Sequence, residues 1–472
     1  MGDTGAVTVR MGAYLAIERS SLSEPARRQL KEALTYPNPA YAKTKNMGYP
    51  TKEPKSFCLY EDDNGVIYLA RGAARRVSKI LKQHDYILNW KDERIRFKPI
   101  GLQWGKLEPF HEQWPAIEKL VSSAQGILRG ETGSGKTETL LGAAIRADQP
   151  TLVIVWNKDL LKQWYDRIVH KYEILPADKV GLIQGPSNKY GPITLAMVQS
   201  LHKRVDQWTN RFGTVIMDEC QRAPATTFLN SVQPFPAKHR WGASADERRK
   251  DGKEFLGYEV FGYDDWNLTR SGKAKPKPVY TIQGGQSLDP QIIVIPTDYT
   301  DDDYEENRNH GQLINRLVKD EPRNKLIARD LKRSLEKGRQ CILFTERVEA
   351  AQWWESVVSS WGFMAGSLIG GTENAEATSN SIRLLKEKKM RFAVTTTYAE
   401  AGLDVPSLDT AFVTCPTASN IKRMHQQVGR IVRPESEKQE PIAYYYWDRG
   451  LTGSSKHLKN IKRKWSKIIQ HD

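Results

Sequence analysis

Residues 130–137 have the types and spacing needed to hold the phosphates of a nucleotide. This segment, GETGSGKT, fits the pattern G-x-x-x-x-G-K-[ST] between an apolar stretch at 126–128 and a helical one at 139–146. In that context, backbone N–H groups close around phosphates, the lysine reaches the β- and γ-phosphates, and the hydroxyl binds Mg²⁺. The predicted nucleotide-binding residues are Gly133, Ser134, Gly135, Lys136 and Thr137, and Thr137 is also a predicted Mg²⁺ ligand.

An acidic pair follows a second apolar segment about eighty residues further on. Asp218 and Glu219 come directly after the strand-like residues 214–217. An acidic residue at the end of a strand near a phosphate loop binds Mg²⁺, and a neighbouring carboxylate can orient and deprotonate a water molecule. We therefore predict that Asp218 is a metal ligand and catalytic residue, and that Glu219 is the general base.

Two arginines near the C-terminal end supply positive charge for a transferring phosphate. Arg430 and Arg433 follow Gln426, and their spacing of three predicts that both guanidinium groups share one helix face. A delocalised, permanent charge suits a γ-phosphate, and an arginine from a second domain can act as a finger. We predict catalytic roles for Gln426, Arg430 and Arg433; the alternative is a basic, solvated helix face.

The elements that must position these groups form an α/β fold. Apolar β-type segments alternate with helical ones from about residue 106, which is typical of βαβ units around a parallel sheet. We predict two parallel-sheet domains, at 106–297 and 298–447, preceded by a small α+β module at 1–105 and followed by a basic tail at 448–472.

The N-terminal module is a candidate DNA-binding domain. A strand is predicted at 7–17, a helix at 24–34, a loop at 36–54, and a hairpin whose turn is the sequence DDNG at 62–65. A basic helix is predicted at 73–82. Its charges favour a nucleic-acid contact; the alternative is again a solvated helix face.

Composition points to an intracellular protein with a polyanionic partner. With 71 Lys plus Arg and 56 Asp plus Glu, the net charge is 71 − 56 = +15, which favours nucleic acid. There is no apolar run near the roughly 18 residues of a membrane span, nor a signal-peptide pattern at the start. The four cysteines are scattered singly, so we expect neither a disulfide framework nor a zinc ribbon.

Taken together, these motifs resemble the superfamily 2 DNA helicases, most closely the XPB/UvsW-like branch that includes phage members. The resemblance covers roughly residues 106–447, and the motifs occur in the family's order. The matching segments are Gln113, 130–137, 152–164, 194–200, 218–221, 242–245, 249–252, 342–347, 402–406 and 426–433.

The resemblance implies two tandem RecA-like lobes with ATP and Mg²⁺ between them, in a DNA helicase or translocase of recombination, repair or replication. It implies a monomer acting on single-stranded or branched DNA in the cytoplasm of a bacterial or phage-infected cell, and no membrane. It also adds ATP-binding roles for Gln113, Gly402 and Asp404. The implied nucleic-acid contacts are Lys158, Gln163, Trp164, Thr194, Gln199, Arg347 and Thr396.

Two departures from the family pattern leave alternatives open. Gln221 stands where the family usually has His, and Asp246 stands where it usually has Thr. Both positions belong to contacts that couple hydrolysis to lobe movement in the family. The alternative functions are a nucleotide-gated DNA-binding subunit and the motor subunit of a defence or restriction complex; an RNA helicase matches the motifs less well.

Overall fold

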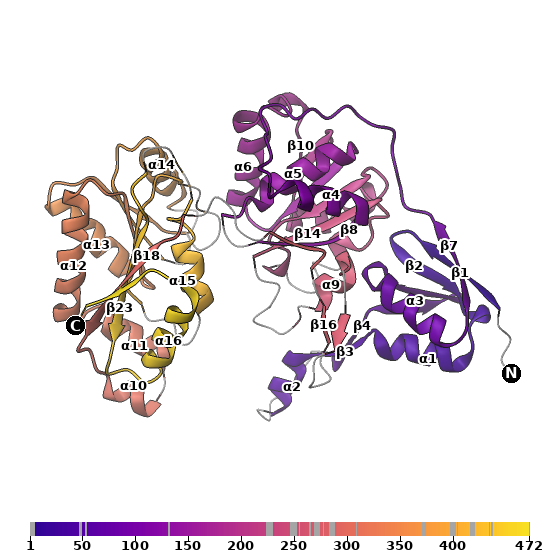
Figure 1. The fold of residues 1–472 in the computed structure, drawn as a ribbon, viewed down its shortest axis with the longest axis horizontal. Helices are drawn as coiled ribbons and strands as arrows, with labels where there is room; N and C mark the ends of the chain where they lie inside the picture. The colour runs from indigo at the N-terminus through magenta and orange to yellow at the C-terminus, as the bar shows by residue number, and fades with distance from the viewer. Residues whose placement is uncertain are drawn as a thin grey trace. The chain divides into compact units, whose positions relative to one another are not determined.

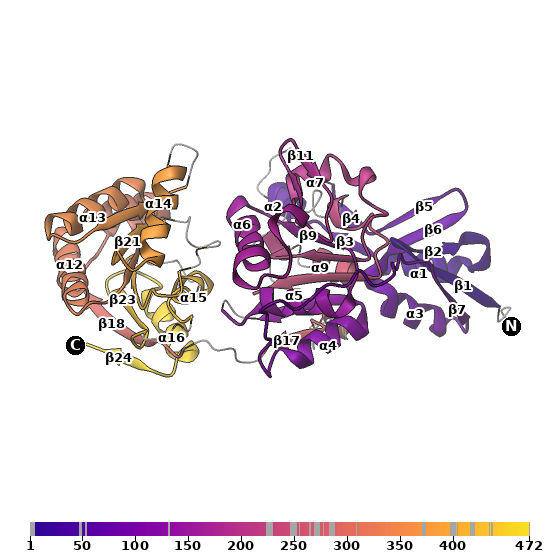
Figure 2. The same ribbon diagram turned by 90° about the horizontal axis from the view of Figure 1, so that it is seen from above.

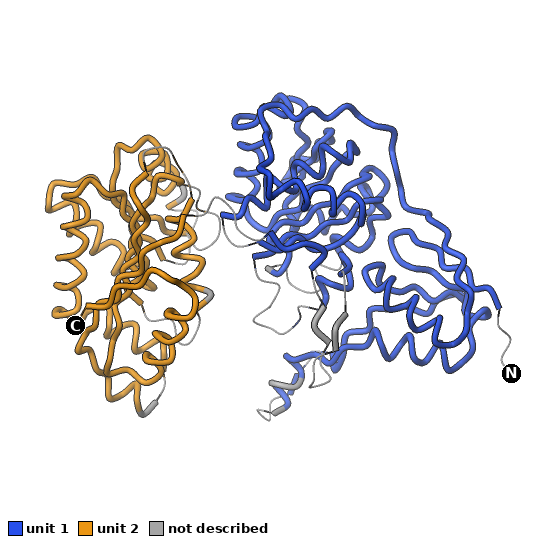
Figure 3. The backbone as a smooth tube through the Cα atoms, viewed as in Figure 1, with its two compact units in different colours: residues 1–284 blue, residues 285–472 orange. Residues whose placement is uncertain are grey.

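The computed structural model divides the chain into two compact units, residues 1–284 (unit 1) and 285–472 (unit 2), which are coloured separately in Figure 3. It describes all residues except 1–4, 47–49, 52–53, 131–132, 223–229, 246–252, 254, 264–265, 269–273, 277, 283–287, 308, 371–373, 397–402, 404, 416–420, 434, 436–437 and 472. Among the described residues, no helix is both long and apolar enough to cross a membrane.

Unit 1 begins with a five-stranded sheet of order β5-β6-β2-β1-β7. The single strand predicted at 7–17 is in fact two antiparallel strands that turn at Gly12, with Arg10 opposite Ala16. The predicted loop at 36–54 contains part of a strand and a helix. The elements are β1 (Ala6–Met11), β2 (Tyr14–Glu18), α1 (Glu24–Ala33), β3 (Thr35–Pro37), α2 (Pro39–Asn46), β4 (Ser56–Cys58), β5 (Tyr60–Asp63), β6 (Val66–Ala70), α3 (Ala74–Gln83) and β7 (Ile87–Asp92).

The predicted hairpin turn is present between β5 and β6. Asn64 and Gly65 have φ values of 47° and 80°, and two successive left-handed residues form the turn that matches the twist of paired strands. The basic helix α3 also forms as predicted, but Arg76 turns inward and pairs with the fully buried Glu259 of α9. The module is thereby anchored to the rest of unit 1.

The main sheet of unit 1 has the order β11-β10-β12-β9-β13-β14-β8-β17 and is parallel except for the β10–β11 pair. Its strands are β8 (Gln125–Gly130), β9 (Thr151–Val155), β10 (Gly181–Gln184), β11 (Ser187–Lys189), β12 (Ile193–Met197), β13 (Thr214–Met217), β14 (His239–Ser244) and β17 (Tyr280–Ile282). The helices are α4 (Trp114–Ser123), α5 (Lys136–Ala147), α6 (Lys158–Asp166), α7 (Val198–His202) and α9 (Phe255–Phe261), and a separate ribbon pairs β15 (Trp266–Leu268) with β16 (Ala274–Pro276).

Both faces of this sheet are covered, because its strands are apolar on both sides. Helices α4, α5 and α6 pack on one face around Val153, Ile216 and Trp241, and α9 lies on the opposite side (Figure 1). The core of that second face continues into the N-terminal module. Such burial on both faces is characteristic of parallel sheets.

Unit 2 is a second, wholly parallel sheet of order β20-β21-β19-β22-β23-β18-β24. Helices α12 and α13 cover one face, and α14, α15 and α16 cover the other (Figure 2). The strands are β18 (Gln291–Thr297), β19 (Cys341–Phe344), β20 (Ala365–Leu368), β21 (Phe392–Thr395), β22 (Thr410–Val413), β23 (Ile442–Asp448) and β24 (Ile468–Gln470). The helices are α10 (Asp302–Asn307), α11 (His310–Leu317), α12 (Glu321–Glu336), α13 (Val348–Ser360), α14 (Ala375–Lys386), α15 (Ile421–Val428) and α16 (Ser454–Lys464).

Two predicted boundaries differ from the structure. Strand β18 pairs with β23 and β24 of unit 2, so the predicted boundary after residue 297 lies too late in the chain. The predicted basic tail is also part of unit 2. Helix α16 buries Leu458 and Ile461 in its core, and β24 adds an edge strand.

Candidate active site

The phosphate loop lies between strand β8 and helix α5, as the motif requires. Gly133 and Gly135 have φ values of 88° and 77°, a conformation that L side chains rarely adopt. The Lys136 ammonium donates to the carbonyl oxygen of Gly130 at 2.8 Å. The Ser134 hydroxyl is buried and has no hydrogen-bond partner among the described residues. Lys136 therefore bonds to the residue at which the loop begins, and Ser134 supplies a polar group suited to a phosphate oxygen.

Gln113 is held against this loop. Its amide nitrogen donates to the carbonyl oxygen of Gly135 at 3.1 Å, and its amide oxygen accepts from the backbone N–H of Phe110 at 2.9 Å. The side chain is 3% exposed and immediately precedes α4. A residue predicted to contact the nucleotide is thus brought to the phosphate loop from another element.

Asp218 lies at the same edge of the sheet as the phosphate loop. Strands β13, β14 and β8 run parallel, so the carboxyl ends of β13 and β8 meet there. Burial, and next the charge of Glu219, raise the pKa of Asp218, while the charge of Lys136 acts in the opposite direction. The positive charge of Lys136 therefore favours the ionised form of Asp218.

Glu219 occupies an unusual backbone conformation. Its φ is 50°, which is uncommon for a residue other than glycine and marks functional turns. Its carboxylate accepts a hydrogen bond from the amide nitrogen of Gln221 at 2.6 Å. Gln221, the first departure from the family pattern, thus orients the predicted general base. Asp246, the second departure, lies outside the described residues.

The residues present fit a magnesium nucleotide. Thr137 lies half-buried in the first turn of α5, where a hydroxyl can bind the metal, and Asp218 offers a buried carboxylate next to a lysine. The partnerless Ser134 hydroxyl and the left-handed glycines form the phosphate cradle. These positions are consistent with the roles predicted for them, which stay predictions.

In unit 2, the predicted arrangement of the two arginines is wrong. Helix α15 carries Gln426 but ends at Val428, so Arg430 and Arg433 do not share a helix face. Arg430 is 6% exposed and donates to the carbonyl oxygen of Leu403 at 3.1 Å, while Arg433 is half-buried. The predicted ATP contacts Gly402 and Asp404 lie outside the described residues.

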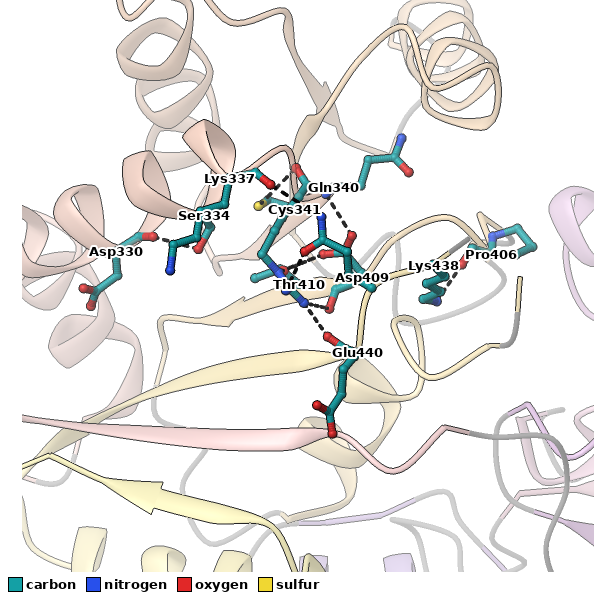
Figure 4. Close-up of polar contacts among 12 residues, drawn as sticks. Asp330, Ser334, Lys337, Gln340, Cys341, Pro406, Asp409, Thr410, Lys438 and Glu440 are labelled. Atoms are coloured by element: carbon teal, nitrogen blue, oxygen red, sulfur yellow. Dashed lines mark hydrogen bonds and ion pairs between the residues drawn. The ribbon is translucent and has the colours of Figure 1, made fainter. Parts of the chain in front are cut away.

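Lys438 connects two segments of unit 2, 402–406 and 426–433, which the resemblance predicts to contact the nucleotide. Its ammonium donates to the carbonyl oxygens of Pro406 and Arg433, both at 2.6 Å; the bond to Pro406 is drawn in Figure 4. Burial lowers the pKa of Lys438 to about 8. The sequence does not identify this lysine, because a single lysine in a loop belongs to no recognisable motif.

Two of the predicted nucleic-acid contacts are wrong. Trp164 is fully buried, and its indole N–H donates to Oδ2 of Asp218 at 2.9 Å. Thr194 is also fully buried, and its hydroxyl bonds the backbone of Gly191. Neither side chain is available to a nucleic-acid backbone, because both are buried in the core of unit 1.

Three other predicted contacts of unit 1 are consistent with a nucleic-acid surface. Lys158 and Gln199 are exposed at the carboxyl ends of the neighbouring strands β9 and β12. The amide of Gln199 donates to the carbonyl oxygen of Trp156 at 3.2 Å, which links the two strand ends. Gln163 is half-buried on α6. These assignments stay predictions.

The predicted contacts of unit 2 lie after two of its central strands. Thr396 is half-buried and follows β21. Arg347 precedes α13, and its guanidinium donates to Oδ1 of Asn315 at 2.6 Å and to the carbonyl oxygen of Gly311 at 2.7 Å. Arg347 therefore also joins α11 to the start of α13, and its contact with nucleic acid stays a prediction.

Sequence reasoning missed the residues that support the phosphate-loop helix. Glu138 in α5 accepts from Arg167 at 3.0 Å and from the hydroxyl of Tyr172 at 3.2 Å. Burial acts to raise the pKa of Glu138, but Arg167 and Lys171 outweigh it and the net shift is downward. The only signal in the sequence is a group of basic residues after α6, and such a group does not show that Glu138 is their partner.

Comparisons with known proteins agree with this geometry. A family model described as "Type III restriction enzyme, res subunit" matches residues 106–245, and one described as "Helicase conserved C-terminal domain" matches residues 323–435. "Putative DNA 3'-5' helicase Rad25" of Halobacterium salinarum is 23% identical over 70% of this chain and 53% of its own length. "Probable helicase D10" of Escherichia phage T5 is 24% identical over 72% of this chain and 71% of its own length.

A solved structure of Dbp5 from S. cerevisiae, bound to RNA and ADP BeF3, covers 77% of this chain and 89% of that chain, with a TM-score of 0.53 and 13% identity. This likeness shows the fold of tandem RecA-like lobes. The chain belongs to the superfamily 2 helicases. Within that superfamily its relatives include Rad25 and XPB proteins, as the motifs predicted. The match spans only about half the length of the archaeal relative.

Proposed function

We propose that this protein is an ATP-driven motor that moves along or remodels DNA. One observation carries the proposal: the parallel sheet of unit 1 brings the phosphate loop and Asp218 to one edge, with the charge of Lys136 acting on the Asp218 carboxylate. That pairing is what hydrolysis of a magnesium nucleotide requires. The family and its helicase-named relatives supply the link from hydrolysis to movement on DNA.

In this proposal, each group of unit 1 has one task. Lys136 binds the β- and γ-phosphates, Ser134 and the loop glycines hold phosphate oxygens, and Gln113 contacts the base. Thr137 and Asp218 would hold Mg²⁺, which neutralises phosphate charge when bound. Glu219 orients and deprotonates the attacking water.

Unit 2 would sense the γ-phosphate. Arg430 and Arg433 supply the positive charge, Gln426 assists, and Gly402 and Asp404 complete the nucleotide contacts. Lys438 would keep the Arg433 segment in place, since it bonds the Arg433 carbonyl oxygen. Loss of the γ-phosphate then changes the preferred state of the protein, which is how hydrolysis drives a two-state motor.

DNA would be gripped through its backbone, without readout of sequence. Lys158, Gln163 and Gln199 in unit 1 and Arg347 and Thr396 in unit 2 are the proposed contacts. The net charge of +15 supports a non-specific, salt-dependent association. Single-stranded or branched DNA is the proposed substrate, a monomer the proposed working form, and recombination, repair or replication inside the cell the proposed setting.

A second candidate function is the motor subunit of a restriction complex. The observation that favours it is the family model matching residues 106–245, whose description names the res subunit of type III restriction enzymes. In that case this chain would hydrolyse ATP on DNA, but cleavage would need a separate nuclease activity.

A strand-displacement assay tests the proposal. Forked DNA labelled with a fluorophore and quencher is mixed with the protein and ATP, with Lys136→Ala as the blank. ATP-dependent separation or branch migration by the wild-type protein supports the motor. ATP-dependent binding without any strand movement contradicts it and favours the restriction-complex subunit or the nucleotide-gated DNA-binding subunit.

A further inference from the structure

The buried indole N–H of Trp164 needs a hydrogen-bond acceptor, and the acceptor is a residue of the proposed metal site. Its N–H donates to Oδ2 of Asp218 at 2.9 Å, while Oδ1 of the same carboxylate accepts from the backbone N–H of Glu219 at 2.9 Å. Among the residues that the structure describes, each oxygen has one protein donor, and the plane of the carboxylate is held from two sides. The remaining lone pairs are left for a metal ion or its water.

The helix that carries Trp164 also begins at the proposed nucleic-acid surface. Helix α6 is capped by Asn157, whose side chain accepts from the N–H of Leu160 at 2.8 Å. Lys158 is the first residue of the helix and is exposed. Trp164 follows fewer than two turns later, on the face that packs into the core of unit 1.

The same face of this segment holds the phosphate-loop helix. Arg167 comes one turn after Trp164, and its guanidinium donates to Oε1 of Glu138 in α5 at 3.0 Å. Residues three apart lie on one side of a helix. Helix α6 and the π-helical turn Arg167–Lys171 that follows it thus contact Asp218 through Trp164 and Glu138 through Arg167.

We propose that Trp164 is a positioning residue that orients Asp218 for Mg²⁺, and that α6 transmits nucleic-acid occupancy at Lys158 to the metal site. This inference rests on the proposed function, because it assigns Asp218 to the metal and Lys158 to the nucleic-acid backbone. It replaces the prediction that Trp164 itself touches nucleic acid.

The physical reason lies in what the carboxylate loses without the indole N–H. A buried carboxylate with one donor instead of two is free to rotate about its side-chain bond and is less well oriented toward the metal. Partners that orient a metal ligand typically contribute about tenfold to a hundredfold in metal affinity. A shift of α6 on nucleic-acid binding would change that orientation, and by reciprocity the metal would change nucleic-acid affinity by the same factor.

The experiment measures metal binding directly. The full chain is saturated with ADP, and Mn²⁺ is titrated while free Mn²⁺ is followed by electron paramagnetic resonance, with and without single-stranded DNA. The variant is Trp164→Phe, which keeps an aromatic ring and removes the N–H donor. The matched control is Trp208→Phe: Trp208 is 4% exposed and donates its indole N–H to Asn188 at 3.2 Å, on the β11 side of the sheet.

We expect Trp164→Phe to weaken Mn²⁺ binding about tenfold and to abolish the effect of DNA on it, while Trp208→Phe behaves as wild type. ADP affinity without metal should change less than twofold in either variant. Should Trp164→Phe fail to fold by circular dichroism, benzothienylalanine is placed at position 164 by codon suppression, since it keeps the ring shape and lacks the N–H.

The failures of the two ideas are distinguishable. Unchanged Mn²⁺ affinity in a folded Trp164 variant overturns the positioning role, even if the wild-type protein hydrolyses ATP on DNA. An equal effect of DNA on wild-type and variant overturns transmission through α6. Absence of any DNA-stimulated hydrolysis in the wild type would instead contradict the proposed function.

Discussion

Gln221 provides a sharp test of how the general base is held. Its amide nitrogen donates to Oε2 of Glu219 at 2.6 Å. A hydrogen bond to a charged group contributes about 1.5–3 kcal/mol, and about 1.4 kcal/mol corresponds to a factor of ten in rate. Both side chains are half-buried, so water replaces part of the bond. We therefore expect Gln221→Ala to lower kcat by about tenfold.

The assay is steady-state ATP hydrolysis with saturating single-stranded DNA, reported as kcat and KM. Gln221 contacts the predicted general base, Glu219, and not the phosphate loop. KM for ATP should therefore change by less than about twofold. Gln221→His, which restores a ring N–H donor, should retain kcat within about threefold of wild type. A Gln221→Ala enzyme with wild-type kcat would refute the reasoning that this bond orients Glu219.

Three further predictions follow from the remaining groups. Lys136→Ala should abolish ATP hydrolysis but leave DNA binding at low salt intact, which filter binding and an ATPase assay together check; loss of both would remove the residue from the proposed role. Arg433→Ala should lower kcat by about a hundredfold or more with a smaller change in ATP affinity, measured by turnover and by binding of a fluorescent nucleotide; unchanged turnover would exclude it as a finger. Burial, followed by the charge of Lys238, lowers the pKa of His239 from 6.5 to about 4. As the pH falls, His239 is therefore protonated in the unfolded chain before it is protonated in the folded chain. The free energy of unfolding decreases as the pH falls below the pKa of the unfolded chain, 6.5. The decrease is about 2 kcal/mol between pH 7 and about pH 5. Denaturant unfolding of wild type and His239→Gln at both pH values checks this: the variant should lack that part of the loss, and an equal loss in both would contradict it.

The chemistry of the site was predictable wherever it depends on local pattern. The GETGSGKT segment, the acidic pair after an apolar strand, and the alternation of strands and helices each specify their structure within about twenty residues. The strand predicted at 214–217 accordingly has the same ends as β13.

What depends on tertiary contacts was not predictable. Trp164 and Asp218 are 54 positions apart. Nothing in the sequence shows that the indole of Trp164 in α6 reaches the carboxylate of Asp218, which follows strand β13. Strand β18 looked apolar but could have joined either sheet, since only its pairing with β23 decides that. The end of α15 before Arg430 had a local signal in Gly429, because glycine commonly follows a helix C-terminus.

The central claim is that ATP hydrolysis by this chain is coupled to DNA. The most direct test is the steady-state ATPase rate of the full chain alone, with single-stranded DNA, with forked DNA and with RNA, using Glu219→Gln as the blank. We expect strong stimulation by DNA, greatest with single-stranded or branched forms, and little by RNA. An ATPase rate that no nucleic acid changes would contradict it.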